Sequence, residues 1–582
     1  MKRTAAQLAA IESTSPRILV LAGPGSGKTS TVVGRLERLI ERGVSPRKIA
    51  AITFTNAAAR ELESRITEPA RDGAVSGVKP RNRPTSLGYC GTLHGFALRC
   101  LKLHGGAEGY GDRISVINPE GAEALLESAN RTIANSKISM KKILETKASG
   151  IPERPSTTPE LVVAHYFGLI RSAGIVDFDV ILTEFARCLR DSPRFGLEIA
   201  EEFEHVFVDE VQDSSPVDWA IYRSLAIRNK FLVGDPDQSI YGFRGAALAE
   251  TFETATDPDW EKILLEENFR SFNAITGAAQ RLIERNAGRV PKETISAVGV
   301  GGRVAVLEAA NAGEEIARLA ALIRMDLVGR KPEELAVLVR TNAAALEISK
   351  GLAAEKIPVA LRTNPDLPKD LPILRALASY LCNPENDTLG FLYLVADPSA
   401  TSAPPDLDRK KAIERAHAFA RNASEARKSI NSFLFGFPKE IPASEFPTIV
   451  AKHRLSHESR MFVAEKLREL PDGAPMVELA HALGSGEEFD AARALSAEGV
   501  RVTTIHSAKG LEFDTVYLAA FEDETIPGRR KDVDVEEERR LAYVGITRAK
   551  RVLQFTSARI RETKWKGLEP RSPSRFIEEA TK

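Results

Sequence analysis

The sequence has few cysteines, and their spacing excludes two classes of site. The 582 residues contain four cysteines, Cys90, Cys100, Cys188 and Cys382, and no two of them form a C-x-x-C pair. This spacing argues against a zinc site, and the small number argues against a disulfide framework. We therefore expect reduced thiols that are partly buried.

The sequence also lacks an excess of charge and any long apolar run. Lys and Arg total 80, as do Asp and Glu, so the formal net charge is zero and any site for a polyanion must be a local basic groove. No stretch approaches the roughly 18 apolar residues of a membrane span, and the N-terminal residues do not form a signal peptide. We expect a cytoplasmic protein that does not contact a membrane.

Apolar and helical segments alternate along the chain in two separate regions. In the first region, strands are predicted at 18–22, 49–54, 206–208 and 231–233, with helices at 31–40 and 56–66. In the second, strands are predicted at 304–307, 335–339, 500–505, 515–519 and 552–555. Residues 67–90 are predicted to be loop, 107–195 to be helical with no strong strand, and 369–490 to be mostly helical. The fold class is therefore α/β, with two parallel-sheet cores that each carry a mostly helical insertion.

A glycine-rich loop follows the first predicted strand. Its sequence, AGPGSGKTS, matches G-x-x-x-x-G-K-[ST] between a strand and a helix, the context of a phosphate-binding loop. Backbone N–H groups of such a loop and the helix N-terminus bind phosphates. We expect Lys28 to hold the β- and γ-phosphates and Thr29 to ligate Mg²⁺. The alternative, a glycine turn that binds nothing, does not explain the strand and the helix on either side.

Acidic and aromatic residues follow the next two strands. In FVDEVQD, Asp209 is expected to hold Mg²⁺ and Glu210 to polarise the attacking water. In GDPDQSIYGFRGA, Gln238 is a candidate contact of the γ-phosphate. Tyr241 and Phe243 are candidates for stacking on nucleobases, although Phe243 could instead belong to a hydrophobic core.

Taken together, the motifs resemble those of UvrD/Rep/PcrA-type DNA helicases of superfamily 1A. The match continues through Gln7 and through residues 50–66, 91–99, 265–271, 502–518, 536–550 and 572–577. The resemblance implies two RecA-like cores of the P-loop NTPase class. Core 1A would comprise 1–106 and 195–270, and core 2A would comprise 271–368 and 491–582. The helical insertions would be 1B at 107–194 and a reduced 2B at 369–490.

The resemblance also implies roles for individual residues. The catalytic group would be Lys28, Asp209, Glu210, Gln238, Arg270 and Arg548. ATP would be bound by Gln7, Ala22, Gly23, Pro24, Gly25, Ser26, Gly27, Lys28, Thr29, Ser30, Phe269 and Glu512, and Mg²⁺ by Thr29 and Asp209. Single-stranded DNA would be bound by Phe54, Thr55, Thr92, His94, Tyr241, Phe243, Arg244 and His506. The sequence departs from the family pattern at Ser30, Ala57 and Phe243, where the family often has Arg, Lys and Trp.

The implied function is that of an ATP-dependent 3′→5′ DNA helicase or single-stranded DNA translocase. Its partners would be single strands and single-strand/duplex junctions, in DNA repair, replication or recombination, with a repair protein or a nuclease as a further partner. Three alternatives remain open. The protein could strip other proteins from DNA without unwinding it, serve as the motor subunit of a nuclease-containing (for example phage-defence) complex, or act as a nucleotide-gated DNA-binding switch. An RNA substrate is a further alternative.

Overall fold

The structure is a computed structural model that describes most of the chain. The described residues are 3–67, 86–105, 115–117, 119–134, 137–148, 155–172, 175–177, 180–242, 248–361, 499–528, 533–563 and 567–582, with the single residues 444, 463 and 467. The chain divides into two compact units. Unit 1 comprises Met1–Phe96, Gly196–Thr363 and Ala491–Lys582, and unit 2 comprises Ala97–Phe195 and Asn364–Asp490.

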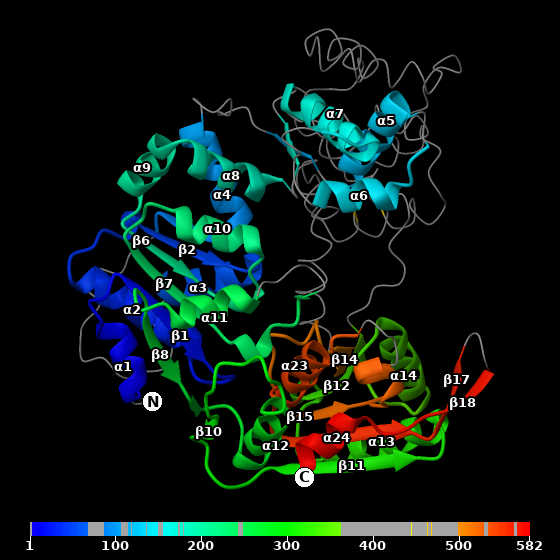
Figure 1. Ribbon diagram of the computed structural model, residues 1–582. Coiled ribbons are helices and arrows are strands. Elements are labelled where there is room, and N and C mark those ends of the chain that lie inside the picture. The colour runs from blue at the N-terminus through cyan, green and yellow to red at the C-terminus, as the bar shows by residue number, and fades with distance from the viewer. Residues whose placement is uncertain are drawn as a thin grey trace. The chain divides into compact units, whose positions relative to one another are not determined.

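The first sheet of unit 1 has six parallel strands in the order β3-β2-β6-β7-β1-β8 (Figure 1). The strands are β1 (Arg17–Ala22), β2 (Ile49–Thr53), β3 (Tyr89–Thr92), β6 (His205–Val208), β7 (Asn229–Gly234) and β8 (Glu261–Leu265). Helices α1 (Ala5–Glu12), α2 (Lys28–Glu41) and α3 (Asn56–Thr67) pack on one face of it. The remaining helices of this region are α4 (Leu93–His104), α9 (Pro193–Glu202), α10 (Pro216–Ser224) and α11 (Leu248–Thr256).

The sequence predicts the central strands of this sheet and misses its edges. The four strands expected from apolar runs are β1, β2, β6 and β7, and Gly43 ends the first crossover helix with a φ of +92°. The two edge strands, β3 and β8, were not expected, and residues 89 and 90 lie in a strand rather than in the predicted loop. Edge strands are half exposed, so β8 begins with two exposed charged residues and has no continuous apolar run.

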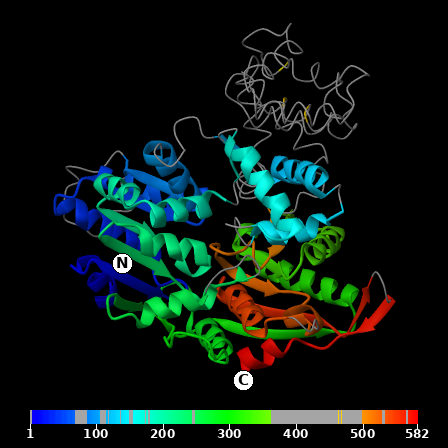
Figure 2. The same ribbon diagram turned by 45° about the horizontal axis from the view of Figure 1, so that its top comes forward.

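The second sheet also has six parallel strands, in the order β11-β16-β15-β12-β14-β13. Figure 2 shows this sheet, in green and orange, in a view turned by 45° from that of Figure 1. They are β11 (Arg303–Ala309), β12 (Leu335–Val339), β13 (Val359–Leu361), β14 (Val500–Thr504), β15 (Phe513–Leu518) and β16 (Ala549–Ala558). Helices α12 (Asn273–Ile283), α23 (Val535–Ile546) and α24 (Arg575–Thr581) pack on one face. Helices α13 (Ala312–Leu327) and α14 (Asn342–Ala354) pack on the other.

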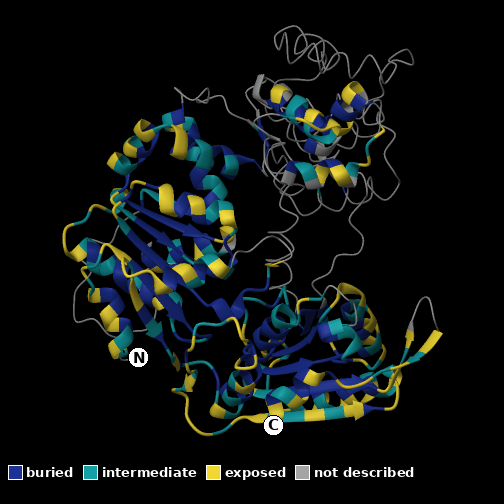
Figure 3. Ribbon diagram, viewed as in Figure 1, coloured by how far each residue is buried: buried dark blue, intermediate teal, exposed yellow. Residues whose placement is uncertain are grey.

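Central strand β12 shows why this sheet could be predicted. Ala336 and Leu338 pack on the α12 side, whereas Leu335, Val337 and Val339 pack on the α13 side. All five residues are buried, and the strands of both sheets are buried in Figure 3 except toward the edges. A parallel strand that is covered on both faces reads as a continuous apolar run. The five predicted strands are confirmed, and together the two sheets are the two RecA-like α/β cores that were expected.

Three smaller pairings complete the strands. Strands β9 (Glu267–Asn268) and β10 (Ile295–Ser296) pair in parallel, and in the sequence both fall between β8 of the first sheet and β11 of the second. Strand β17 (Ile560–Thr563) forms a hairpin with β18 (Gly567–Pro570). In unit 2, β4 (Ser115–Ile117) pairs with β5 (Ile175–Asp177). The region was expected to be helical with no strong strand, and this pair adds two short strands to its helices. Each of these two strands has only three residues, too few for a recognisable pattern.

The described helices of unit 2 are α5 (Pro119–Ala134), α6 (Met140–Ala148), α7 (Thr158–Ser172) and α8 (Ile181–Asp191). A buried ion pair joins α6 to β5, with Lys147 Nζ 2.8 Å from the Asp177 carboxylate. The predicted helical stretch at 369–490 lies outside the described residues apart from three single positions.

No helix in the described part of the chain is both long and apolar enough to cross a lipid bilayer.

Candidate nucleotide site and nucleic-acid track

The glycine-rich loop lies between the end of β1 and the start of α2. Gly25 and Gly27 have φ values of +66° and +80°, which favour glycine. The space is also closed to side chains. A Cβ atom at position 25 would lie 2.6 Å from Arg270 Cβ, and one at position 27 would lie 2.7 Å from Gln7 Nε2. Neighbouring groups therefore press against the backbone of this loop.

The carbonyl groups of Gly23 to Gly27 all accept hydrogen bonds, one from within the loop and the others from neighbouring segments of unit 1. The acceptor and donor pairs are Gly23 O with Ser26 Oγ (2.7 Å), Pro24 O with Asn268 Nδ2 (2.6 Å), Gly25 O with Phe269 N (2.9 Å), Ser26 O with Gln7 Nε2 (2.9 Å) and Gly27 O with Thr31 N (2.9 Å). In a trans peptide the N–H points away from the C=O. The N–H groups of Gly25, Gly27 and Lys28 are therefore directed away from these donors, as an anion-binding loop requires.

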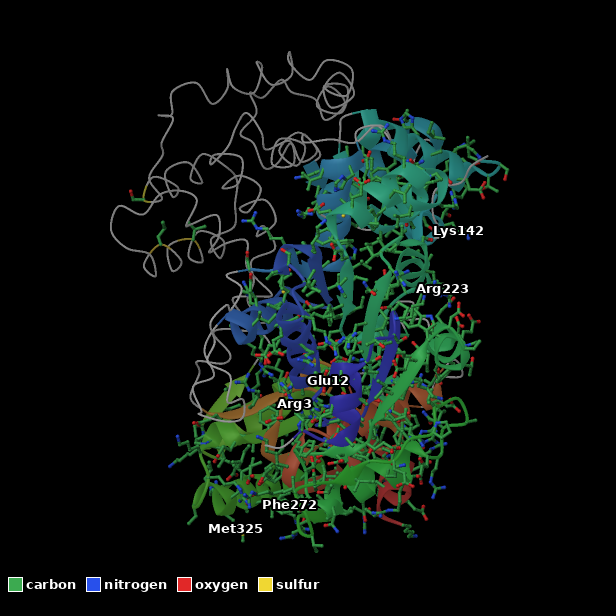
Figure 4. The ribbon with its side chains drawn as sticks, turned by 90° about the vertical axis from the view of Figure 1, so that its left-hand side faces the viewer. Arg3, Glu12, Lys142, Arg223, Phe272 and Met325 are labelled. Carbon is green, nitrogen blue, oxygen red and sulfur yellow. The ribbon has the colours of Figure 1, made fainter. Side chains whose placement is uncertain are left out.

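Helix α1 is fastened to α2 and carries Gln7 to the loop. Arg35, which is buried on α2, donates to Ile11 O at 2.9 Å and also to Ser13 O, so it caps the end of α1. Arg3 and Glu12, before and at the end of α1 (Figure 4), both form ion pairs with α2. Gln7 Oε1 accepts the Thr4 N–H at 3.1 Å while its Nε2 reaches Ser26 O. These two bonds use one N–H and one lone pair of the Gln7 amide.

Two carboxylates stand at the end of β6, next to this loop. The Asp209 N–H donates to Ile52 O at 2.9 Å, and Glu210 has the left-handed φ of 55°. Glu210 Oε1 lies 3.5 Å from Lys28 Nζ. Burial, and then the charge of Glu210, raise the pKa of Asp209 to about 7. Burial opposes ionisation of Glu210 as well, but Lys28 and Lys509 outweigh it and lower the pKa of Glu210 to about 2.

A buried glutamine connects these carboxylates to the segment after β7. Gln212 Nε2 donates to Glu210, and Gln212 Oε1 accepts the Asp235 N–H at 2.9 Å. Gln238, in the short helix η4 (Pro236–Gln238), is buried, and its Nε2 donates to the Asp235 carboxylate at 2.5 Å. The first core thus presents a connected row of polar side chains from Glu210 to Gln238.

Two arginines approach from the other side of the site. Arg548 follows α23 and is almost fully buried, and its Nη2 donates to Gln238 Oε1 at 3.1 Å. Burial, with a smaller contribution from Arg270, lowers the pKa of Arg548. Arg270 packs on Gly25 and donates from Nε to Glu512 at 2.7 Å. Glu512 also pairs with Lys550 at 2.7 Å, so its carboxylate has two cationic partners.

The remaining predicted nucleotide contacts lie at the mouth of the loop. Thr29 is half buried in the first turn of α2, and Ser30 next to it is exposed. Phe269 is half buried, and its backbone N–H is bonded to the loop. Unit 1 therefore brings most of the predicted nucleotide contacts into one region: Gln7, Lys28, Asp209, Glu210, Gln238, Arg270 and Arg548.

An aromatic surface lies beside the two carboxylate-bearing segments. The rings of Phe54 and Tyr241 stack with centroids 5.3 Å apart and an interplanar angle of 22°. His506 lies 6.4 Å from Tyr241, and Lys509 Nζ lies 5.2 Å over the Tyr241 ring. Phe54 is 42% exposed, so the stack is open to solvent. Three of the residues predicted to bind DNA, from both cores, are thus in one row.

The other predicted DNA contacts lie one strand away or outside the described residues. Thr92 ends β3, opposite Thr53 at the end of β2, and His94 follows in the first turn of α4. Thr55 is exposed and caps α3 through its Oγ1, which accepts the Ala58 N–H at 3.1 Å. Phe243 and Arg244 lie outside the described residues.

Comparison with known proteins accounts for this arrangement. The family model described as UvrD/REP helicase N-terminal domain matches residues 3–258. The model described as UvrD-like helicase C-terminal domain matches residues 263–399 and 474–559. The chain belongs to the UvrD/Rep/PcrA-type helicases.

Curated relatives extend over nearly the whole chain. The chain is 28% identical to the ATP-dependent DNA helicase PcrA of Leuconostoc citreum over 649 residues, covering 98% of this chain and 84% of the relative. It is 26% identical over 639 residues to the ATP-dependent DNA helicase PcrA of Staphylococcus aureus strain Mu50, covering 98% of this chain and 85% of the relative. The resemblance inferred from the motifs is thereby confirmed.

Sequence reasoning missed two polar residues that organise the site of this UvrD-like helicase. Asn268 is 1% exposed and donates to Pro24 O, while its Oδ1 accepts the N–H groups of Arg270 (2.9 Å) and Ser271 (2.7 Å). It therefore joins the phosphate loop to the segment that carries Arg270. Gln212 has a similar linking role. Their positions inside the motifs LEENFRS and FVDEVQD were the only signals available.

Proposed function

We propose that this UvrD-like helicase uses ATP to move along single-stranded DNA with 3′→5′ polarity and to separate duplexes. The observation that carries the proposal is the contact between Arg548 of the second core and Gln238 of the first. This contact lies beside the ion pair of Lys28 and Glu210, in which Lys28 Nζ is 3.5 Å from Glu210 Oε1. A guanidinium that reaches the phosphate site only when two cores meet can couple hydrolysis to core movement.

We propose these roles at the nucleotide. Lys28 and the loop N–H groups bind the β- and γ-phosphates, and Glu210, with its lowered pKa, accepts a hydrogen bond from the attacking water. Gln238, Arg270 and Arg548 contact the γ-phosphate. Gln7 reads the edge of adenine, Phe269 stacks on its face, and Glu512 holds the ribose once its ion pairs with Arg270 and Lys550 rearrange.

Thr29 and Asp209 would hold Mg²⁺. A hydroxyl and a carboxylate supply the hard oxygen ligands that this cation prefers, and Lys28, next to Thr29 in the chain, is paired with Glu210, next to Asp209. The ion would neutralise charge on the phosphates when bound. The protein residues orient the phosphates and the water around it.

The aromatic row is the proposed DNA track. Phe54 and Tyr241 belong to the first core and His506 to the second, so closure of the cores would shift one part of the track against the other. Stacking supports any base sequence. Thr55, Thr92 and His94 would extend the track along the ends of β2 and β3, and Phe243 and Arg244 would continue it beyond Tyr241.

The setting is also a proposal. We place the protein in the cytoplasm, in DNA repair, replication or recombination, with junctions as substrates and a nuclease or repair protein as a further partner. We keep the division into cores 1A (1–106 and 195–270) and 2A (271–368 and 491–582), with insertions 1B (107–194) and 2B (369–490).

The experiment is strand displacement with ATP and Mg²⁺ on duplexes with a 3′ tail, a 5′ tail or blunt ends. Unwinding of the 3′-tailed duplex alone is expected. Lys28→Ala is expected to abolish both unwinding and DNA-stimulated hydrolysis while leaving the melting temperature of the protein nearly unchanged. Hydrolysis that persists in Lys28→Ala would overturn the site assignment.

Two other results would select a different function. Hydrolysis stimulated by DNA without unwinding of any duplex, together with removal of proteins from coated single strands, would indicate a translocase. ATP-dependent DNA binding with very slow hydrolysis would indicate a switch. Repeating the hydrolysis assay with an RNA strand of the same sequence tests the preference for DNA.

A further inference from the structure

Four charged side chains form a sealed cluster that none of the roles above uses. Asp235 and Asp237 come from the segment after β7 in the first core. Arg289 and Lys292 come from the segment between α12 and β10 in the second core. The exposed fractions of these side chains are 0% for Asp235, 3% for Asp237, 11% for Arg289 and 1% for Lys292. Two cations therefore balance two carboxylates away from water.

The two cations have different partners. Lys292 Nζ contacts both carboxylates, Asp235 Oδ1 and Asp237 Oδ2, the latter at 2.7 Å. Of the two carboxylates, Arg289 contacts only Asp237, from Nη2 at 3.0 Å and from Nε at 3.4 Å, and its Nη2 also donates to Lys292 O at 3.2 Å. Burial opposes the charge of Lys292, but Asp235 and Asp237 outweigh it and raise its pKa. Lys292 is thus the cation that neutralises Asp235.

Asp235 in turn fixes the side chain of Gln238. Its Oδ2 accepts Gln238 Nε2 at 2.5 Å, which leaves Gln238 Oε1 facing Arg548 Nη2 at 3.1 Å. A carboxylate accepts this bond most strongly when it is ionised, and a buried carboxylate stays ionised only beside a cation. Because the Nε2 end of the Gln238 amide is bound to Asp235, its Oε1 end has a fixed direction. The orientation of Gln238 therefore depends on the cation beside Asp235.

We propose that Lys292 is a positioning residue for ATP hydrolysis. It fixes the Asp235 carboxylate through Oδ1, so that Oδ2 holds Gln238 turned toward Arg548 and the γ-phosphate. The inference rests on the proposed function, because it assumes that Gln238 and Arg548 act on ATP. It adds that the second core has, through Lys292, a direct ionic connection to the groups of the first core that respond to the γ-phosphate.

The test compares two double variants that each remove one buried cation and the Asp237 carboxylate. Lys292→Gln with Asp237→Asn takes away the cation that contacts Asp235. Arg289→Gln with Asp237→Asn takes away the cation that does not, and it leaves the Lys292–Asp235 pair in place. Both lose one buried cation and the Asp237 carboxylate, and the Gln238→Ala background described below separates a positioning effect from a general structural one. Each is measured as the full chain with saturating single-stranded DNA, for kcat and for the KM of ATP.

The double variant Lys292→Gln/Asp237→Asn is expected to lower kcat by about 10- to 100-fold, the usual effect of removing the partner of a functional side chain. Its KM for ATP should change little, since the phosphate loop is untouched. The double variant Arg289→Gln/Asp237→Asn should keep kcat within about threefold of the wild type, because Lys292 still holds Asp235 and Asp235 still holds Gln238. In a Gln238→Ala background the Lys292→Gln/Asp237→Asn change should cause no further loss, since interacting residues are not additive.

The inference is overturned if both double variants lower kcat equally, or if Lys292→Gln/Asp237→Asn has the same effect with and without Gln238. Should that double variant melt below the assay temperature, Lys292→Gln with Asp235→Asn replaces it and leaves the Arg289–Asp237 ion pair intact. It must show the same loss of kcat. Failure of the proposed function looks different, because the wild-type protein itself would then show no DNA-stimulated hydrolysis.

Discussion

Replacing Arg548 by Lys tests whether hydrolysis depends on a guanidinium delivered from the second core. Arg548 donates from Nε to Val544 O (3.0 Å), from Nη1 to Leu511 O (3.1 Å) and from Nη2 to Gln238 Oε1 (3.1 Å). These acceptors lie on different sides of one planar group. Lysine keeps the charge but concentrates its donors at a single atom, so it cannot make all three contacts.

The expected magnitude follows from the loss of one preorganised donor to developing charge. Such a loss costs about 2.7–4 kcal/mol of transition-state stabilisation. At about 1.4 kcal/mol for each factor of ten, kcat should fall by about 100- to 1000-fold. Arg548→Met, which also removes the charge, should fall at least as far. ADP lacks the γ-phosphate, so its affinity should change by less than about threefold.

The assay is single-turnover ATP hydrolysis with saturating DNA, alongside ADP binding and thermal melting. Arg540→Lys is a matched control, because Arg540 is also a buried arginine of the second core that contacts the first, through Ser239 O at 2.9 Å. It does not donate to Gln238, so kcat should fall by less than about tenfold. If Arg548→Lys keeps more than a tenth of the wild-type kcat, or loses ADP binding in proportion, the reasoning is refuted.

Three further variants test the track and the packing of the cores. Tyr241→Ala should weaken single-stranded DNA binding by about 1–3 kcal/mol in a fluorescence titration, because it removes a ring beside Phe54 on which a base would stack, whereas Tyr241→Phe should bind normally. Burial lowers the pKa of Lys230 from 10.5 to about 8, so the unfolded chain binds more protons between these values and folding should gain up to about 3 kcal/mol as pH rises through this window. That rise should be missing from denaturant unfolding of Lys230→Met. Arg561→Met should destabilise the second core by about 3–5 kcal/mol, since Arg561 pairs with the buried Glu522 at 2.8 Å, and adding Glu522→Gln should recover part of the loss.

Strand prediction succeeded for the central strands of both sheets and for one edge strand, β11, whose residues 304–307 are all apolar. The run 335–339 was expected as a strand and is β12 with the same bounds, because each of its residues is covered by helices on one side or the other. The edge strand β13, with three residues, and β8, with its charged start, have no such pattern. The order of strands within each sheet depends on contacts between distant segments, which local periodicity does not contain.

The candidate site divides in the same way. Groups that act from one loop, such as Lys28, Asp209 and Glu210, could be predicted because a strand, a glycine-rich or acidic turn and a helix are local features. Residues that act through a distant partner could not. The partner of Asn268 is 244 positions away along the chain, and that of Arg548 is 310 positions away. Resemblance to the family named Arg548, but only the structure identifies the side chain that it meets.

This division has a consequence for how the protein should respond to ATP. The loop N–H groups, Lys28 and the carboxylates all belong to the first core, whose internal contacts hold them whether or not the second core approaches. The bond between Gln238 and Arg548, by contrast, is lost if the cores separate by even a small distance, because a 3.1 Å hydrogen bond weakens steeply as it lengthens. Hydrolysis should therefore depend on core closure much more sharply than nucleotide binding does. DNA that bridges Tyr241 and His506 can favour closure without touching the nucleotide, and this is how a strand lying on the aromatic row would stimulate hydrolysis.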